Sequence, residues 1–369
     1  MINFELDEEQ KLIRETVIGF ARDEIRPYAR EADEKGAVPA SLLQRGWELG
    51  LVQGIIPEEY GGSGSEHSAL TGAVIAEELA YGDLAIAMHL LAPRLLTVPL
   101  VEFASSALKR SLLPAFCGDV FEAGTAAVME PRFDFDSSAP ATVLRRDGDE
   151  YVVSGAKCYV PLGSQAKHIV VLAGLANGDG TVHPQAVVVA RDTPGLRVGG
   201  REKSMGLKAL ETTSLELDAC RVPRDHVLAA GDERAMRRLA DLWHVGLGAM
   251  AVGVARAAYD YAREYAKERR AFGQAIAQKQ AIAFMLAEMA MEVDAMRLLV
   301  WEAAWKLDRH EDATREAYLS KRYASDMVLR IADNALQVLG GHGYIRDHLV
   351  ELFLRNARGF ATLEGLAIA

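Results

Sequence analysis

A glutamate near the end of the sequence, Glu364, is the side chain best suited to acid–base chemistry. Its neighbours Phe360, Leu363, Leu366 and Ile368 are apolar. Apolar surroundings disfavour the charged form of a carboxylate, and a carboxylate in that state suits general-base work near neutral pH. We therefore predict that Glu364 removes a weakly acidic C–H proton.

Two further segments combine polar or aromatic side chains with glycines. One runs from Glu268 to Gly273 (ERRAFG) and the other from Gln337 to Gly343 (QVLGGHG). Taken alone, each has an ordinary structural explanation, because an arginine stabilises a helix C-terminus and glycines end helices. A third segment, 246–251 (GLGAMA), fits a loose dinucleotide fingerprint, but it lies inside a helical pattern and is interpreted as chance.

Several classes of protein are disfavoured by composition and by the lack of their motifs. The chain has 369 residues and a formal net charge of -11, which argues against a nucleic-acid partner. It contains neither a Walker-type loop nor H-E-x-x-H, and its three cysteines are far apart, so we expect no metal site and free thiols. An acidic N-terminal segment and the lack of a long apolar run predict a cytoplasmic protein without membrane insertion.

The spacing of apolar residues predicts three successive regions. Helical spacing runs from Asp7 to about Cys117, and it returns after Gly231 with one stripe that contains Met289, Val293 and Met296. Between them lie short β-branched runs at 151–153, 168–172 and 186–190, with turn residues at 147–148 and 177–180. We therefore predict an α+β fold, mainly α, with an N-terminal helical domain (1–124), a middle antiparallel β-barrel or sandwich (125–230) and a C-terminal helical bundle (231–369).

Together, these pieces resemble the acyl-CoA dehydrogenase family, and the resemblance runs from about Phe4 to Gly365. The matching segments are FELDEEQKLIRETV, LGLVQGIIPEEYGG, VMEP, GDEYVVSGAK, MGLKALETTSLELDACRVPRDHVL, YAKERRAFG, QAIAFMLAEMA and QVLGGHGY. The resemblance implies a helical domain, a β domain and a four-helix bundle, assembled as a dimer of dimers. It also implies FAD and the removal of two hydrogens from the α and β carbons of an acyl thioester.

The resemblance also implies roles for particular residues. Glu364 stands at the position of the family's catalytic base, whereas the alternative position of some branches, near the start of the first bundle helix, holds Trp243 and His244 with only Asp241 close by. The residues that would clamp the adenosine diphosphate end of a neighbouring subunit's FAD are Arg269, Phe272, Gln280, Gln337, Gly340 and Gly341.

The residues expected on the flavin side depart from the family pattern. Met129 replaces the usual threonine before Glu-Pro, Tyr159 replaces the tryptophan that packs on the flavin, and Pro161 replaces a hydroxyl donor. Each lost hydrogen bond to a cofactor is worth roughly 1–3 kcal/mol. The residues of the adenosine clamp, in contrast, match the family pattern.

Two functions follow from this combination. The first is an FAD-dependent acyl-CoA dehydrogenase in which Glu364 is the general base, acting on acyl-CoA or acyl-carrier-protein thioesters and passing electrons to an acceptor of the electron-transfer-flavoprotein type. The alternative is a flavin-clamping or non-redox subunit of a hetero-oligomer, in which a sister chain carries intact flavin-side motifs.

Overall fold

The computed structural model describes residues 4–64, 67–176 and 182–369. Its first part is helical, as predicted. The helices are α1 (Glu8–Phe20), α2 (Ala29–Lys35), α3 (Ala40–Glu48), α4 (Ala69–Gly82), α5 (Leu84–Leu91), α6 (Arg94–Phe103) and α7 (Ser106–Leu112). Asp7 caps α1 in a capping box with Gln10. The helical pattern over 7–32 is not one α-helix, because a π-helical turn and a 3-10 turn that contains Pro27 separate α1 from α2.

The middle part is a seven-stranded sheet with the order β1-β4-β2-β3-β7-β6, and β5 pairs with β4. The strands are β1 (Thr125–Ala127), β2 (Val143–Asp147), β3 (Glu150–Pro161), β4 (His168–Ala176), β5 (Val182–Ala190), β6 (Leu196–Arg201) and β7 (Thr212–Pro223). Each predicted β-branched run lies in a strand, and the predicted turn at Gly148 joins β2 to β3, which pair in antiparallel fashion. The predicted turn at 177–180 lies outside the described residues.

The antiparallel prediction for this sheet needs one correction. β4 pairs in parallel with both β1 and β2, while β2–β3, β3–β7, β4–β5 and β6–β7 are antiparallel. Parallel partners need a longer connection than a hairpin, and here strand β3 lies in the chain between β2 and β4, while both β2 and β3 lie between β1 and β4. Turn residues in the sequence reveal hairpins, but they do not reveal pairings between strands that are far apart in the chain.

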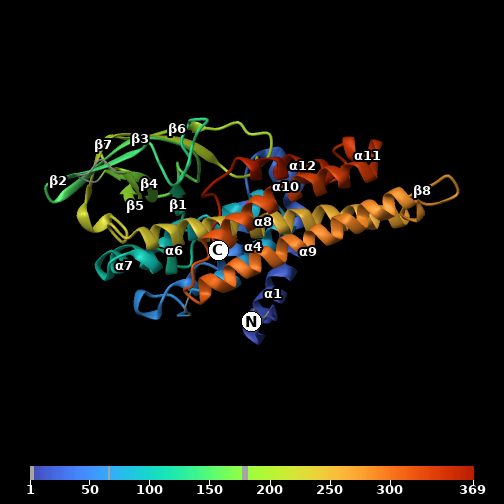
Figure 1. The fold of residues 1–369 in the computed structure, drawn as a ribbon, viewed down its shortest axis with the longest axis horizontal. Helices are drawn as coiled ribbons and strands as arrows, with labels where there is room; N and C mark the ends of the chain where they lie inside the picture. Colours follow the sequence, from blue (N-terminus) through green and yellow to red (C-terminus); the bar gives the residue numbers. More distant parts are fainter. Residues whose placement is uncertain (1–3, 65–66, 177–181) are drawn as a thin grey trace.

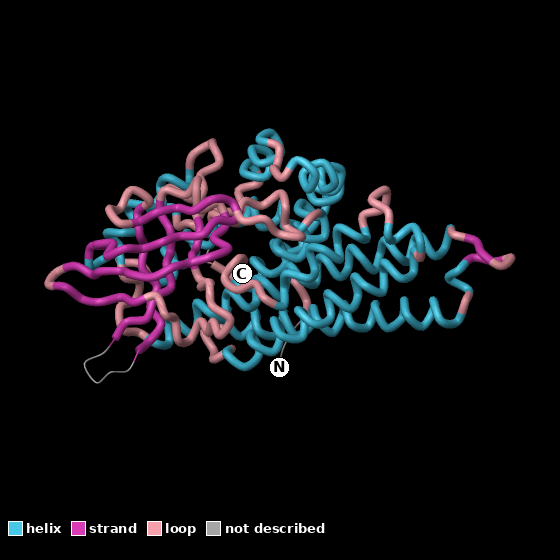
Figure 2. Tube along the Cα trace, turned by 90° about the horizontal axis from the view of Figure 1, so that it is seen from above, coloured by secondary structure: helices cyan, strands magenta, loops and turns pink. Residues whose placement is uncertain are grey.

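The last part is the helical bundle. Three long helices, α8 (Glu233–Glu268), α9 (Gln280–Asp308) and α10 (Thr314–Leu339), lie side by side along the long axis of the molecule (Figure 1). The shorter α12 (Val350–Ala357) packs on α8 and α10 as the fourth helix, after the short α11 (Gly341–Tyr344). The hairpin of β8 (Arg270–Ala271) and β9 (Gln274–Ala275) projects at one end of the bundle, away from the sheet (Figures 1 and 2).

Helix α4 joins the N-terminal helices to the bundle through buried charges. Its Glu77 accepts hydrogen bonds from Arg256 of α8 and Arg297 of α9, and its Glu78 is paired with Arg256 and with Arg14 of α1. Both glutamates are buried. A buried charge that loses its partner is strongly destabilising. Any displacement of α4 that separates these pairs is therefore unfavourable, and the cluster fixes the position of α4 against the bundle.

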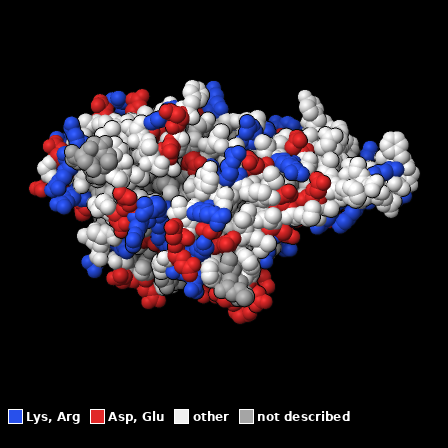
Figure 3. Space-filling view, viewed as in Figure 1, with Lys and Arg blue, Asp and Glu red and all other residues white. Residues whose placement is uncertain are grey.

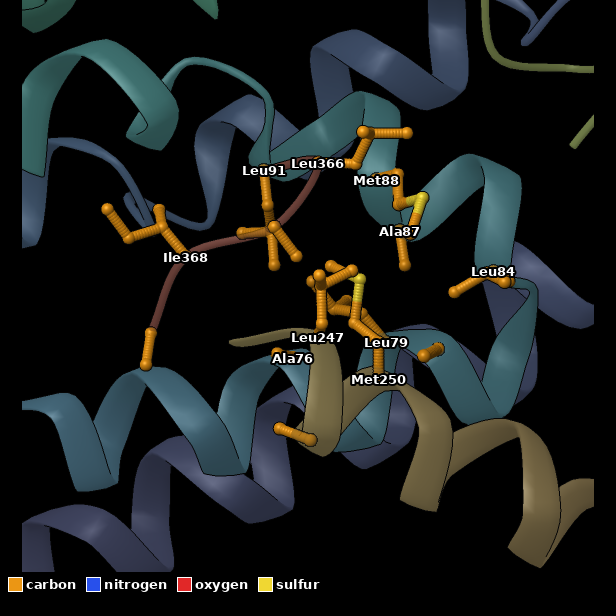
Figure 4. Close-up of a cluster of buried hydrophobic side chains, with 14 of the residues drawn as sticks. Ala76, Leu79, Leu84, Ala87, Met88, Leu91, Leu247, Met250, Leu366 and Ile368 are labelled. Carbon is orange, nitrogen blue, oxygen red and sulfur yellow. The ribbon is translucent and has the colours of Figure 1, made fainter. Parts of the chain in front are cut away.

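The final residues of the sequence run through the interior rather than over the surface. Leu366 and Ile368 belong to a buried apolar cluster that also contains Leu79 of α4, Met88 of α5 and Leu247 of α8 (Figure 4). Residues 366–369 are all buried. The segment that follows Glu364 is therefore a structural part of the core between α4, α5 and α8.

The surface and the apolar helices bear on possible partners. On the face drawn in Figure 3, positive and negative side chains are interspersed. Within the described residues no single helix is long and apolar enough to cross a membrane. By length and composition only the bent pair α5 and α6 passes that test, and most of its residues are buried.

The three cysteines are free thiols, as predicted, with Cys220 buried and Cys117 and Cys158 half-buried.

Candidate active site

Glu364 lies between helices α8 and α10 and is paired with two basic side chains. Lys321 of α10 donates a hydrogen bond from Nζ to Oε1 of Glu364, and Nε2 of His244 in α8 lies 3.6 Å from Oε2. The Glu364 side chain keeps 24% of its surface exposed. The prediction of apolar surroundings is therefore wrong for the carboxylate itself, although Phe360 and the other apolar neighbours are buried.

His244 responds to the same surroundings. Burial lowers the pKa of its imidazole below the ordinary value, although the negative charge of Glu364 opposes that shift and Lys321 adds to it. A neutral His244 next to a Lys321–Glu364 pair leaves the lysine as the group that balances the carboxylate charge. The arrangement holds the Glu364 side chain at a half-buried position between α8 and α10.

The backbone of Glu364 and Gly365 is packed directly on the strand-end segment that holds Met129. The amide of Glu364 donates to Sδ of Met129 over 3.4 Å. Gly365 has a φ of 65°, and a Cβ placed on it would lie 2.2 Å from Cγ2 of Val128. Only glycine combines that φ with so close an approach, which gives a physical reason for the Glu-Gly pair at this place.

A buried ion pair fixes the segment around Met129. Lys157 of β3 donates to Glu130 over 2.9 Å and to the carbonyl of Val128 over 3.0 Å, and the amide of Cys158 donates to the Met129 carbonyl over 3.0 Å. Burial lowers the pKa of Lys157 to about 8, against the opposing charge of Glu130. These contacts tie the loop after β1 to β3 and so to the face that meets Glu364.

Tyr159 lines a cavity of about 280 Å³ between the sheet and the C-terminal part. Its φ of 53° marks an irregularity in β3, and its amide donates to the carboxylate of Glu202. The opposite wall includes Leu363 and Leu366, which flank the Glu364-Gly365 pair. The structure thus brings three predicted site residues, Met129, Tyr159 and Glu364, into one region.

The six residues predicted to clamp the adenosine end lie elsewhere. They stand around the ends of α8 and α10 and the start of α9, near the projecting β8–β9 hairpin (Figures 1 and 2). All six are exposed: Arg269, Phe272, Gln280, Gln337, Gly340 and Gly341. Tyr265 of α8 holds this end together by a 2.9 Å hydrogen bond to Nδ1 of His342. Within one chain these residues are remote from Tyr159 and Glu364.

The alternative acidic residue, Asp241, is not part of this site. It is buried, Oγ1 of Thr314 donates to it over 3.3 Å, and burial raises its pKa to about 7. It lines a different cavity, with Arg238 and His310. Among the described residues no group of three or more His, Cys, Asp or Glu side chains could hold a metal ion.

Comparison with known proteins identifies the family. The models for the N-terminal, middle and C-terminal domains of acyl-CoA dehydrogenases match residues 7–119, 125–220 and 230–367. The probable acyl-CoA dehydrogenase YngJ of Bacillus subtilis is 37% identical over 369 residues, covering 99% of this chain and 96% of that protein. The chain belongs to the acyl-CoA dehydrogenase family.

Solved structures of similar proteins agree with this assignment to the acyl-CoA dehydrogenase family. Butyryl-CoA dehydrogenase from Megasphaera elsdenii has a TM-score of 0.87 and 30% identity, with 97% of this chain and 95% of that chain covered. A chain in a structure of the electron transferring flavoprotein of Acidaminococcus fermentans has the same TM-score and identity, with 98% and 95% covered. The predicted family and fold are therefore confirmed.

The residues present fit a flavin better than the missing motif hydroxyls suggested. The cavity beside Tyr159 is also lined by Lys203, Ser204 and Thr212, which place donors near the aromatic ring. At the other end, a Cβ on Gly340 or Gly341 would meet no atom within 4 Å, so the backbone there is open to a ligand. Donors in the Tyr159 cavity suit the flavin end of a dinucleotide, and the accessible glycine backbone suits the adenosine end of a dinucleotide held by a neighbouring chain.

Sequence reasoning missed the basic partners of Glu364. Lys321 was inside a helical pattern without any motif, and His244 was considered only as a residue that is not a base. The helical spacing of apolar residues predicts that Lys321 and His244 lie at the edge of the bundle core, because each is one turn or less from buried positions of its helix. The spacing does not reveal that both residues contact Glu364.

Proposed function

We propose that this chain is the catalytic subunit of an FAD-dependent acyl-CoA dehydrogenase in which Glu364 is the general base. The observation that carries the proposal is the convergence of Glu364, Met129 and the Tyr159 cavity at the junction of the sheet and the bundle. The residues next to Glu364, Leu363 and Leu366, line the cavity in which a flat ring and an acyl thioester would meet. Membership of the acyl-CoA dehydrogenase family supports the same reaction.

In the proposed mechanism, the Glu364 carboxylate removes the proton from the α carbon of the acyl thioester. Lys321 and His244 limit the directions in which the Glu364 carboxylate can turn, because Lys321 donates to Oε1 and His244 lies beside Oε2. When bound, a flavin would supply the hydride acceptor for the β carbon. Leu363 and Leu366 shield the region beside the base from water.

The cofactor is proposed to be FAD that is shared between subunits. Tyr159, Met129 and the donors of the Tyr159 cavity would lie against the flavin end. Arg269, Phe272, Gln280, Gln337, Gly340 and Gly341 would hold the adenosine diphosphate end of a neighbour's FAD, since an arginine fork and open glycine backbone suit pyrophosphate. A dimer of dimers would complete each site.

Substrate and electron acceptor are proposed by class. The similar butyryl-CoA dehydrogenase suggests a short acyl-CoA thioester, and a carrier-protein thioester is the variant to test beside it. The similar chain in a structure of an electron transferring flavoprotein suggests an acceptor of that type.

A second candidate function has its own support. The exposed clamp residues are remote from Tyr159 within the chain, and the flavin-side hydroxyls of the family pattern are missing at Met129 and Pro161. The chain would then hold the FAD of a sister subunit in a hetero-oligomer. A flavin content of one per chain in a preparation of this chain alone would contradict this second function.

The test of the proposed function is turnover of acyl-CoA with an artificial electron acceptor. Glu364→Gln keeps the shape of the side chain and removes the base, so we expect turnover to fall by about a thousandfold or more. Glu311→Gln, which changes an exposed glutamate paired with Arg309, is the matched control and should keep full turnover. Unchanged turnover in Glu364→Gln would contradict the role of Glu364.

A further inference from the structure

Strand β3 contains a bulge at the point where it reaches the Tyr159 cavity. Its pairing with β7 shifts register between Lys157 and Val160. Two residues of β3, Cys158 and Tyr159, therefore oppose the single residue Ser214 of β7. Tyr159 has a φ of 53°, in the left-handed region that residues other than glycine rarely adopt. A bulge with such a residue re-aims a side chain and needs contacts that hold it in place.

Both backbone amides of the bulge have partners outside the β3–β7 ladder. The amide of Cys158 donates to the carbonyl of Met129 over 3.0 Å. The amide of Tyr159 donates to the two carboxylate oxygens of Glu202 over 3.1 and 3.0 Å. A hydrogen bond to a carboxylate is stronger than one to a neutral carbonyl, because the acceptor is charged. Glu202 therefore makes the stronger of the two contacts that hold the bulge.

Glu202 comes from a strand that does not neighbour β3. It follows the last residue of β6, and β7 lies between β6 and β3 in the sheet. The amide of Glu202 donates to the carbonyl of Thr212 over 2.9 Å, which fixes its backbone against β7. The next two residues, Lys203 and Ser204, line the cavity beside Tyr159. One short segment thus holds the bulge and forms part of the cavity wall.

We propose that Glu202 is a positioning residue for the flavin site, because its carboxylate holds the bulge of β3 in the conformation that keeps Tyr159 at the cavity wall. This role rests on the proposed function, in which Tyr159 packs on the flavin. The Tyr159 side chain lines the cavity and the residue is 38% exposed, so its ring has free surface for a flat ligand. Without Glu202 the amide of Tyr159 loses its acceptor, and the ring loses its fixed place.

The variants separate the hydrogen bond from the charge. Glu202→Gln keeps an acceptor within reach of the Tyr159 amide and removes the charge. Glu202→Asp keeps the charge and withdraws the acceptor by one methylene, while Glu202→Ala removes both. Tyr159→Leu removes the aromatic ring itself. The matched control is Glu216→Ala, which removes an exposed carboxylate of β7 that is paired with Arg197.

The experiment measures FAD binding to the assembled protein after removal of its flavin. Flavin fluorescence gives the Kd, and at saturation it reports ring contact, because a tyrosine in contact with a flavin quenches its emission. We expect Glu202→Ala and Glu202→Asp to raise the Kd about tenfold, through loss of the charge-assisted hydrogen bond, and to leave the bound flavin more fluorescent. Glu202→Gln should keep most of the affinity and the quenching, and Glu216→Ala should keep all of both.

A double variant tests whether Glu202 acts through Tyr159. In the Tyr159→Leu background, Glu202→Ala should change neither the Kd nor the fluorescence further. Additive effects of the two substitutions would overturn the positioning role, because Glu202 would then act without the ring.

Failure of this role and failure of the proposed function give different results. If Tyr159→Leu changes neither the Kd nor the fluorescence, Tyr159 does not contact the flavin, and the proposed cofactor placement falls together with the role of Glu202. If Tyr159→Leu changes both while Glu202→Asp behaves as Glu216→Ala does, only the role of Glu202 is wrong. Glu202→Asp carries this test even if the Glu202→Ala protein does not fold.

Discussion

At the scale of single residues, the hydrogen bond from Lys321 to Glu364 makes a prediction about turnover. Nζ of Lys321 donates to Oε1 of Glu364 and so fixes the orientation of the carboxylate, and a positioned base transfers a proton more efficiently than a mobile one. In Lys321→Met we expect kcat to fall by about tenfold. The measurement is kcat and KM with an acyl-CoA, and Lys306→Met, which breaks a lysine–glutamate pair with Glu316, is the control. An unchanged kcat in Lys321→Met would show that Lys321 does not position the base.

A second residue-scale prediction concerns the stability contributed by Asp241. Burial raises its pKa to about 7, above the value of about 3.9 in an unfolded chain. The folded state therefore holds the proton more tightly, so stability is lost as pH rises from about 4 to about 7. Asp241→Asn removes this loss, and we expect its advantage over the parent to be larger at pH 8 than at pH 4, by about 4 kcal/mol. Urea unfolding at both pH values tests this, with exposed Asp333→Asn as the control.

At the scale of elements, the packing of α4 on α8 depends on Gly253. A Cβ there would lie 2.2 Å from the carbonyl oxygen of Glu77 and 2.9 Å from the amide of Tyr81. Gly253→Ala improves helix propensity by about 1 kcal/mol, but it forces the two helices apart. We expect a net loss of about 1–2 kcal/mol in the free energy of unfolding.

Gly19→Ala is the matched control for Gly253→Ala. Gly19 lies inside α1, and a Cβ on it would meet no atom within 4 Å. The same substitution should therefore raise the free energy of unfolding by about 0.5–1 kcal/mol. Equal effects at the two glycines would contradict the close approach of α4 and α8.

The elements themselves were largely predictable, because helical and β periodicity are local properties. The apolar stripe through Met289, Val293 and Met296 is buried in α9, and the three β-branched runs are strands. The parallel pairing of β4 with β1 and β2 was not predictable from such patterns. For the same reason the sequence placed Glu364 in a motif but did not reveal Lys321 and His244, which reach it through tertiary packing.

At the scale of the whole molecule, the exposed clamp predicts a dependence of flavin content on Arg269. Arg269 lies at the C-terminal end of α8, which is remote from the strand β3 that carries Tyr159 in the same chain (Figure 1). A charge-assisted contact to pyrophosphate is worth about 1.5–3 kcal/mol, so Arg269→Ala should weaken FAD binding about tenfold or more. The ratio of absorbance at 450 and 280 nm after gel filtration measures this. Arg270→Ala, a change to the next and equally exposed arginine, is the control, and equal flavin loss in both variants would contradict a specific clamp.

The reductive half-reaction tests the central claim most directly. The assembled protein, reconstituted with FAD, is mixed without oxygen with butyryl-CoA while absorbance at 450 nm is followed. We predict that the flavin of the parent protein is bleached, and that Glu364→Gln keeps its flavin and binds the thioester but bleaches about a thousandfold more slowly or not at all. Bleaching of Glu364→Gln at the parent rate, with full flavin occupancy in both proteins, would contradict Glu364 as the base.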